Sequence, residues 1–107
     1  MLISSLLGFA AMAATQPDPT RASREAFSRC LFSYAEAQAR ERTELAAFET
    51  ALAQQCMNEE RAFREAIRAQ QASLRVPAAE IQEITTMEVE DARANTKARF
   101  EDATTPR

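Results

Sequence analysis

Apolar residues recur at spacings of three and four along most of this chain, the spacing that aligns side chains on one face of a helix. The first stripe begins after residue 20 and consists of Phe27, Cys30, Leu31 and Tyr34. It lapses between residues 37 and 42 and then resumes with Leu45, Phe48, Leu52, Cys56, Phe63, Ile67 and Leu74. The pattern predicts two helical segments that are separated near residue 43.

A third helical segment follows a proline. Val76-Pro77 ends the second stripe, because proline disfavours helical geometry in the residue before it and cannot donate to the hydrogen-bond ladder. Pro77 itself suits the first position of a new helix. That helix carries a ragged stripe made of Ile81, Ile84, Met87, Val89, Ala92 and Phe100. The apolar pattern therefore predicts an all-α, three-helix domain over residues 20–102, followed by a disordered tail at 103–107.

The first segment of the chain is uncharged through Gln16. Its apolar core of about 13 residues is shorter than the about 20 needed to span a bilayer, but it fits a secretory signal. We expect a signal peptide at 1–13 and a linker at 14–19. No Lys or Arg follows Met1, so a buried helix or an uncleaved anchor stays open, and only the uncleaved form would contact a membrane. Export would favour a disulfide between two cysteines.

Cys30 and Cys56 distinguish two architectures. In one unbroken helix over residues 20–75 they would lie roughly 39 Å apart, whereas a disulfide needs Cα atoms roughly 4.4–6.8 Å apart. Each cysteine would then have to pair with a second chain in a coiled-coil dimer. If the chain instead turns back, the residue midway between the cysteines is Thr43, which suits the N-cap of a helix. We favour this second fold, a disulfide-stapled antiparallel helical hairpin plus a third helix.

The hairpin register also aligns the apolar stripes, since it places Phe27 near Phe63. Closing the loop between the cysteines would stabilise the fold by about 3 kcal/mol in the chain-entropy model. That contribution is substantial for a domain this small, whose core is limited.

The composition excludes several kinds of site. The chain has no His, and its one glycine is Gly8, so it lacks the residues for Ser-His-Asp catalysis, histidine zinc sites and glycine-rich phosphate loops. Two cysteine thiolates are too few for a cysteine-only metal site. The net charge of −3 argues against a general nucleic-acid-binding protein. We expect no enzymatic activity, no cofactor, no metal and no nucleic-acid partner.

Four arginines fall close to one line along the second predicted helix, namely Arg61, Arg64, Arg68 and Arg75. This line is a candidate surface for an anionic partner, such as a lipid head group or a polyanion, or for a protein partner. Two other interpretations are a solvated helix face and an internal surface that pairs with acids of the third helix, namely Glu80, Glu83 and Glu88. Exposed pairs of that kind contribute about 0–1 kcal/mol each.

Two acids, one phenylalanine and two methionines are further candidates for site residues, and none of them predicts a site from the sequence. The adjacent acids Glu59 and Glu60 point in different directions on a helix, so they do not predict a shared acid–base or metal site. Phe32 lies beside the first stripe and faces either the third helix or an external partner. Met57 and Met87 are expected to be packing residues.

The pattern Phe27-x-x-Cys30, then Phe48, Cys56 and Phe63, behind a short signal, resembles a group of small uncharacterised exported bacterial proteins. These have two cysteines and a helical hairpin followed by a third helix. The resemblance implies the disulfide and the fold type, and it implies no activity.

We therefore expect a periplasmic or secreted, non-enzymatic protein with a binding or structural role in the cell envelope. Its partner would be an unidentified protein or another envelope component. The alternative is a disulfide-linked coiled-coil dimer that acts as a spacer or interaction rod, and the oligomeric state stays open.

Overall fold

The computed structural model describes residues 18–106, which form four helices and no strand. The helices are α1 (Pro19–Arg40), α2 (Leu45–Leu52), α3 (Met57–Ser73) and α4 (Ala78–Thr104). The expected signal peptide at 1–13 and residues 14–17 of the expected linker lie outside the described residues. The all-α class is confirmed. α4 continues about one turn past Phe100, through Ala103 and Thr104, so the first two residues of the expected disordered tail at 103–107 are helical.

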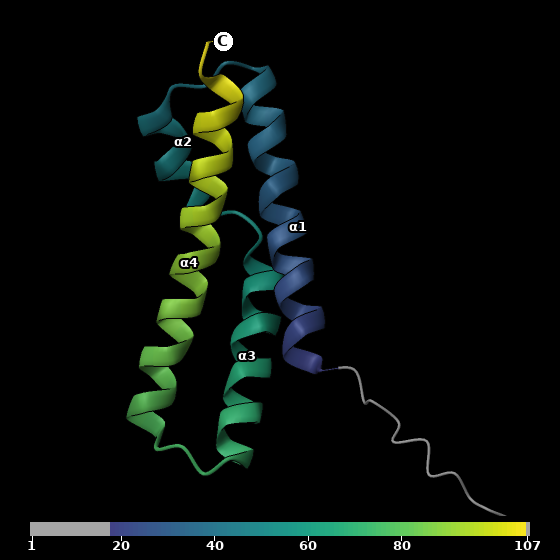
Figure 1. Ribbon diagram of the computed structural model, residues 1–107, viewed down its shortest axis with the longest axis vertical. Helices are drawn as coiled ribbons and strands as arrows, with labels where there is room; N and C mark the ends of the chain where they lie inside the picture. Colours follow the sequence, from purple (N-terminus) through teal and green to yellow (C-terminus); the bar gives the residue numbers. More distant parts are fainter. Residues whose placement is uncertain (1–17, 107) are drawn as a thin grey trace, which may run out of the picture.

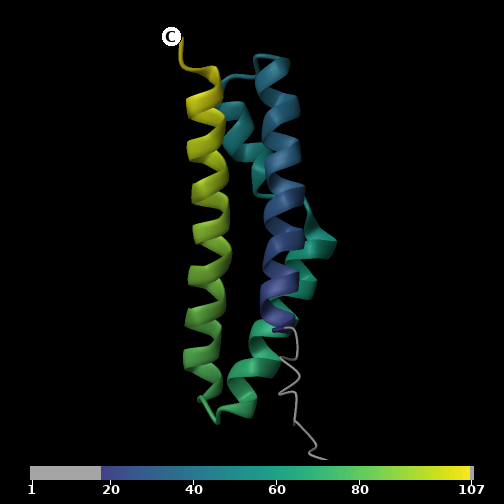
Figure 2. The same ribbon diagram turned by 45° about the vertical axis from the view of Figure 1, so that its right-hand side comes forward.

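The long helices lie side by side with alternating directions (Figure 1). α1 and α4 run towards the end of the molecule where the C-terminus lies, and α2 and α3 run the opposite way. α1 packs against both α3 and α4, and α3 packs against α4. The short α2 lies beside α1 and α4 at the C-terminal end, as the rotated view also shows (Figure 2).

The second predicted helix differs from the structure, because it is two helices rather than one. The chain leaves the helix after Leu52 and re-enters at Met57. Cys56 precedes α3 with φ 60° and ψ 40°, the left-handed conformation. Such a residue cannot continue a right-handed helix. The stretch between the helices has no glycine or proline, so the apolar spacing alone could not locate this break.

The turn between α1 and α2 lies where the stripe lapses, but its cap differs from the expectation. Arg42 adopts φ 58°, and the amide of Thr43 donates to the carbonyl of Gln38 at 3.1 Å. The Thr43 hydroxyl also donates to the Gln38 side chain at 2.7 Å. Thr43 therefore closes the end of α1, while Glu44 occupies the N-cap of α2 without a side-chain hydrogen bond.

The remaining helix ends follow from local chemistry. The Asp18 carboxylate accepts from the amide of Thr20 at 3.0 Å and caps α1. After α3, Arg75 adopts φ 61°, and the amide of Val76 donates back to Gln71 at 3.1 Å, which satisfies a helix-end carbonyl. The chain turns at Val76-Pro77, as expected, but Pro77 occupies the N-cap of α4 rather than its first helical position, which is Ala78.

The core is built on four fully buried phenylalanines. Phe27 and Phe63 have ring centroids 5.9 Å apart, which confirms the expected proximity of these residues. Phe48 stacks on Phe100 at 4.0 Å, so the short α2 is anchored to α4. The other buried apolar members of the cluster are Leu31, Ala35, Leu52, Ile67, Val89 and Ala92.

Candidate functional site

The two cysteines form a disulfide within one chain, which confirms the expected bond. Their Cα atoms lie 6.0 Å apart, within the usual range. Cys30 comes from the middle of α1 and Cys56 from the N-terminus of α3, and both are half-buried. The bond therefore joins two helices whose sequence positions are 26 apart.

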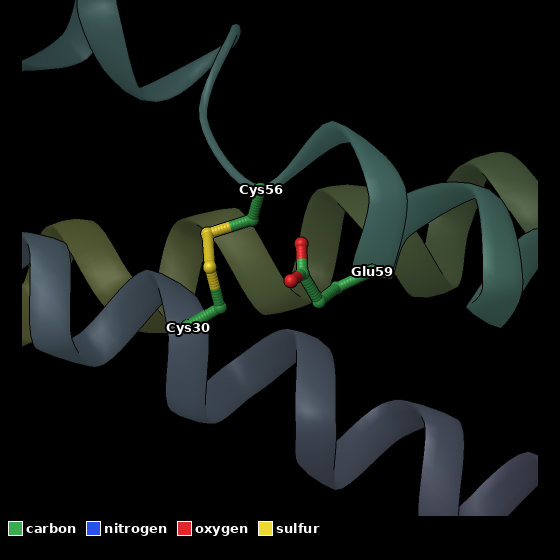
Figure 3. Close-up of side chains that lie close together, drawn as sticks. All are labelled: Cys30, Cys56 and Glu59. Carbon is green, nitrogen blue, oxygen red and sulfur yellow. A yellow bond between two sulfur atoms is a disulfide. The ribbon is translucent and has the colours of Figure 1, made fainter.

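The carboxylate of Glu59 lies next to the disulfide (Figure 3). Its oxygen and the two sulfurs all lie within 4.8 Å of one another. Glu59 belongs to the first turn of α3, and over residues 18–106 the structure has no ion pair that involves it. The three side chains thus form a small cluster, here called the sulfur–carboxylate cluster.

The neighbouring acid, Glu60, points elsewhere, as expected for adjacent residues of a helix. Glu60 is only 9% exposed. Its carboxylate accepts from Arg64 Nε at 2.9 Å and from Arg93 of α4. Arg93 also donates to the carbonyl of Ala53 at 3.2 Å, so one guanidinium ties α4 to both the α2–α3 connection and α3.

A groove of about 670 Å³ lies between α3 and α4, beside their connecting turn. Three of the four predicted arginines line it, namely Arg61, Arg64 and Arg68. Its apolar lining consists of Ala72, Val76, Ala78 and Ile81. Arg75 does not line the groove and lies in the turn that closes it. The structure therefore brings three of the predicted arginines to one depression, and we call it the α3–α4 groove.

The charges along this groove are partly compensated. Arg68 pairs with Glu65, and hydrogen bonding from Arg68 lowers the pKa of Glu65, which also lines the groove. Arg64 shares the single carboxylate of Glu60 with Arg93, so one positive charge of that trio is uncompensated. Within the described part of the chain, no ion pair involves Arg61.

The expected internal pairing with acids of the third predicted helix takes a different form. Glu88 pairs with Arg24 of α1 at 3.3 Å rather than with the arginine row. For residues 18–106 no ion pair joins Glu80 or Glu83 to that row. The acids that compensate the row come from α3 itself.

Three further side chains are placed clearly. Phe32 faces α4, where the Arg99 guanidinium lies 3.9 Å from its ring centroid, a cation–π contact. Met57 and Met87, expected to pack in the core, are 51% and 58% exposed. The predicted stripe of the third segment includes Met87, whereas Met57 lies outside the second stripe, and neither methionine is on the buried face of its helix.

Comparisons with protein-family models, with curated proteins and with solved structures found no match. None of the four described helices combines the length and the apolar character needed to cross a bilayer.

Proposed function

We propose that this protein is a non-enzymatic, exported component of the cell envelope that binds anionic phospholipid surfaces through the α3–α4 groove. This proposal departs from the sequence-based expectation, in which only an uncleaved signal segment would contact a membrane. The observation that carries the proposal is the position of three arginines beside an apolar lining in one groove. A polyanion needs only the charges, whereas a lipid surface offers a phosphate for the guanidinium groups and hydrocarbon for the apolar residues.

The charge arrangement supports an anionic partner. Arg61 has no ion pair among the described residues, and Arg64 and Arg93 share one carboxylate. Arginine binds phosphate through paired N–H groups and stays charged at any physiological pH. Arg75, in the turn at the end of the groove, adds another cation. A basic residue close to an anionic membrane contributes about 1 kcal/mol.

The apolar residues of the turn support a lipid rather than a soluble anion. Leu74 is 66% exposed, and Val76 and Ala78 line the groove next to it. This part of the molecule is the end of the bundle at which α3 and α4 meet (Figure 1). Exposing the Leu74 side chain to water is unfavourable in free energy, and contact with a membrane interface would bury that side chain.

We also propose that the protein is exported and that its helices form the stapled hairpin. The uncharged apolar segment before residue 17 and the disulfide support a periplasmic or secreted location. We propose that α1 and the α2–α3 segment form the stapled antiparallel hairpin and that α4 is the helix that covers it. The rod alternative requires an unbroken helix over residues 20–75 and cysteines that bridge two chains, whereas α1 ends at Arg40 and the cysteines bond to each other.

The lipid proposal is tested by sedimentation of the purified oxidised protein with vesicles. We expect binding to vesicles that contain phosphatidylglycerol and no binding to vesicles of phosphatidylcholine alone. The double variant Arg61→Gln/Arg75→Gln should bind roughly fivefold more weakly for each arginine removed. Arg29→Gln/Arg40→Gln on α1 removes the same charge, and it should bind like the unmodified protein.

A second variant separates lipid from soluble anion. Leu74→Ser should weaken vesicle binding while leaving any binding of inorganic polyphosphate unchanged. Equal binding to both vesicle types, or equal effects of the two arginine pairs, would overturn the lipid proposal. Export is tested separately by the mass of the protein recovered from the periplasmic fraction, which should lack about 13 N-terminal residues.

A further inference from the structure

We propose that the sulfur–carboxylate cluster is a redox-gated metal site: after reduction of the disulfide, Cys30, Cys56 and Glu59 bind one thiophilic divalent cation such as Zn²⁺ or Cd²⁺. This inference is independent of the lipid proposal. Its basis is the placement of three ligand atoms within 4.8 Å of one another, on two helices that the core holds together.

The geometry needs only a small adjustment. Two thiolates at about 2.3 Å from a tetrahedral zinc ion lie roughly 3.8 Å apart, and a carboxylate oxygen binds at about 2.0–2.2 Å. The Cα atoms of the cysteines are 6.0 Å apart, and the Glu59 side chain already points at the sulfurs (Figure 3). Opening the S–S bond and rotating the two cysteine side chains therefore creates room for an ion without moving α1 away from α3.

The electrostatics favour a cation. Cys56 is at the N-terminus of α3, where the positive end of the helix dipole stabilises a thiolate. Two thiolates and the Glu59 carboxylate would repel one another, and a divalent cation removes that repulsion. In the residues that the structure describes, no basic side chain pairs with Glu59, so its carboxylate is available as a ligand.

The donor set selects the kind of metal. Two soft sulfur ligands and one harder oxygen suit Zn²⁺ and Cd²⁺ better than Mg²⁺ or Ca²⁺. Both cysteines are half-buried, so a water molecule can complete a four-coordinate site. The chain has no His and only these two cysteines, so thiolate coordination is confined to this position.

The chemistry balances as two steps. A dithiol reductant transfers two electrons and two protons to the disulfide, which yields the Cys30 and Cys56 thiols and the oxidised disulfide of the reductant. The divalent cation then displaces one proton from each thiol, so that two protons are released for each ion bound. The oxidised protein has no thiolate and does not bind the ion. The metal thereby replaces the covalent link between α1 and α3 when the bond is reduced.

The experiment uses the full chain, reduced with a phosphine under anaerobic conditions and then freed of reductant. Titration with Cd²⁺ should produce the ultraviolet sulfur-to-cadmium charge-transfer band at one ion per chain, with two protons released, and calorimetry with Zn²⁺ should give the same stoichiometry. The oxidised protein should show neither signal. Reduction should lower the melting temperature, and adding the ion should reverse at least half of that decrease.

Variants test the individual ligands. Glu59→Gln leaves the disulfide intact before reduction and should weaken metal binding by at least tenfold, whereas Glu80→Gln removes an exposed acid of α4 and should change nothing. Cys30→Ser should abolish the charge-transfer band. One ion bound between two chains, unchanged affinity in Glu59→Gln, or a reduced protein that neither binds the ion nor refolds with it would overturn the proposal.

Discussion

The guanidinium of Arg93 on α4 donates to the carboxylate of Glu60 on α3, and both side chains are largely removed from solvent. Burial lowers the pKa of Arg93, although a guanidinium stays charged in proteins. The same Arg93 reaches the carbonyl of Ala53 at 3.2 Å. This pair therefore fixes the position of the α2–α3 break relative to α4, and it is the point at which three elements meet.

Replacing one partner of this pair should be costly. Glu60→Leu leaves the partly buried Arg93 without its carboxylate, and we expect a loss of about 3 kcal/mol in the free energy of unfolding. Glu65→Leu removes an acid of the same helix whose pair with Arg68 is exposed to solvent, so it should lower the free energy of unfolding much less. Urea denaturation followed by circular dichroism measures both changes.

The double variant Glu60→Leu/Arg93→Met controls for the cost of an unpaired charge. It should recover most of the lost stability, because replacing both members of a buried pair by apolar residues is often neutral. If Glu60→Leu and Glu65→Leu were equally mild, the Glu60–Arg93 pair would have no special structural role.

Two of the three turns between the described helices could be predicted from the sequence. The lapse of the stripe and the Val76-Pro77 break located the first and last turns, whereas the break before Cys56 gave no signal. Arg42, Cys56 and Arg75 all have positive φ near 60°, in turns where glycine is usual. The only glycine of the chain is Gly8, so the usual residue that marks such positions is absent from them.

Arg42→Gly should stabilise the protein by about 0.5–1 kcal/mol. A non-glycine residue in the left-handed region costs roughly 1–2 kcal/mol, and the greater freedom of glycine in the unfolded chain offsets part of the gain. The control is Arg29→Gly, in the middle of α1 and exposed, which should lose about 1 kcal/mol. The midpoints of thermal and urea denaturation should therefore rise for Arg42→Gly and fall for Arg29→Gly.

The ragged stripe of α4 has a specific explanation. Its buried face is Ile81, Thr85, Val89, Ala92, Thr96 and Phe100, which has regular helical spacing once the two threonines are counted as core residues. Each hydroxyl donates to the carbonyl four residues earlier, at 2.7 Å for Thr85 and 2.8 Å for Thr96. Because the hydroxyls are satisfied inside the helix, the methyl groups can be buried. A classification of threonine as polar hides this face.

Thr96 tests that explanation, since it is fully buried. Thr96→Ser keeps the hydroxyl and deletes the methyl, so it should cost about 1 kcal/mol. Thr96→Val keeps the shape of the side chain and deletes its hydrogen bond to the Ala92 carbonyl. That carbonyl also accepts the backbone hydrogen bond of the helix, so Thr96→Val should lower the free energy of unfolding less than Thr96→Ser. The reverse order in urea denaturation would mean that the hydroxyl, and not the methyl, makes the larger contribution.

The candidate sites were predictable to different degrees. The disulfide followed from the number and spacing of the cysteines, and the arginine row followed from helical periodicity. The place of Glu59 beside the sulfurs did not, because it depends on the left-handed Cys56, which re-starts the helix and sets the direction of its first turn. The apolar lining of the α3–α4 groove likewise depends on the angle at which α4 returns.

The anchoring of α2 depends on one aromatic residue. Phe48 is fully buried, stacks on Phe100 at 4.0 Å and lies 5.8 Å from the ring of Tyr34. Phe48→Ala should cost about 3–5 kcal/mol, and amide hydrogen exchange should show loss of protection over residues 45–52. Leu45→Ala, on the same helix but 39% exposed, should leave that protection in place.

The polar link between α2 and α4 should give a characteristic pH dependence. Lys97 Nζ lies 2.8 Å from the Glu49 carboxylate, and this hydrogen bond, with a smaller effect of Glu101, raises the pKa of Lys97. Because the raised pKa belongs to the folded state, the stabilisation is complete below the ordinary lysine pKa of about 10.4 and is lost as the pH rises through the folded-state value. An NMR titration of the Lys97 side chain should shift to lower pH in Glu49→Gln, and the exposed Glu44→Gln should leave it unchanged. Identical titrations in all three proteins would show that Glu49 does not pair with Lys97 in solution.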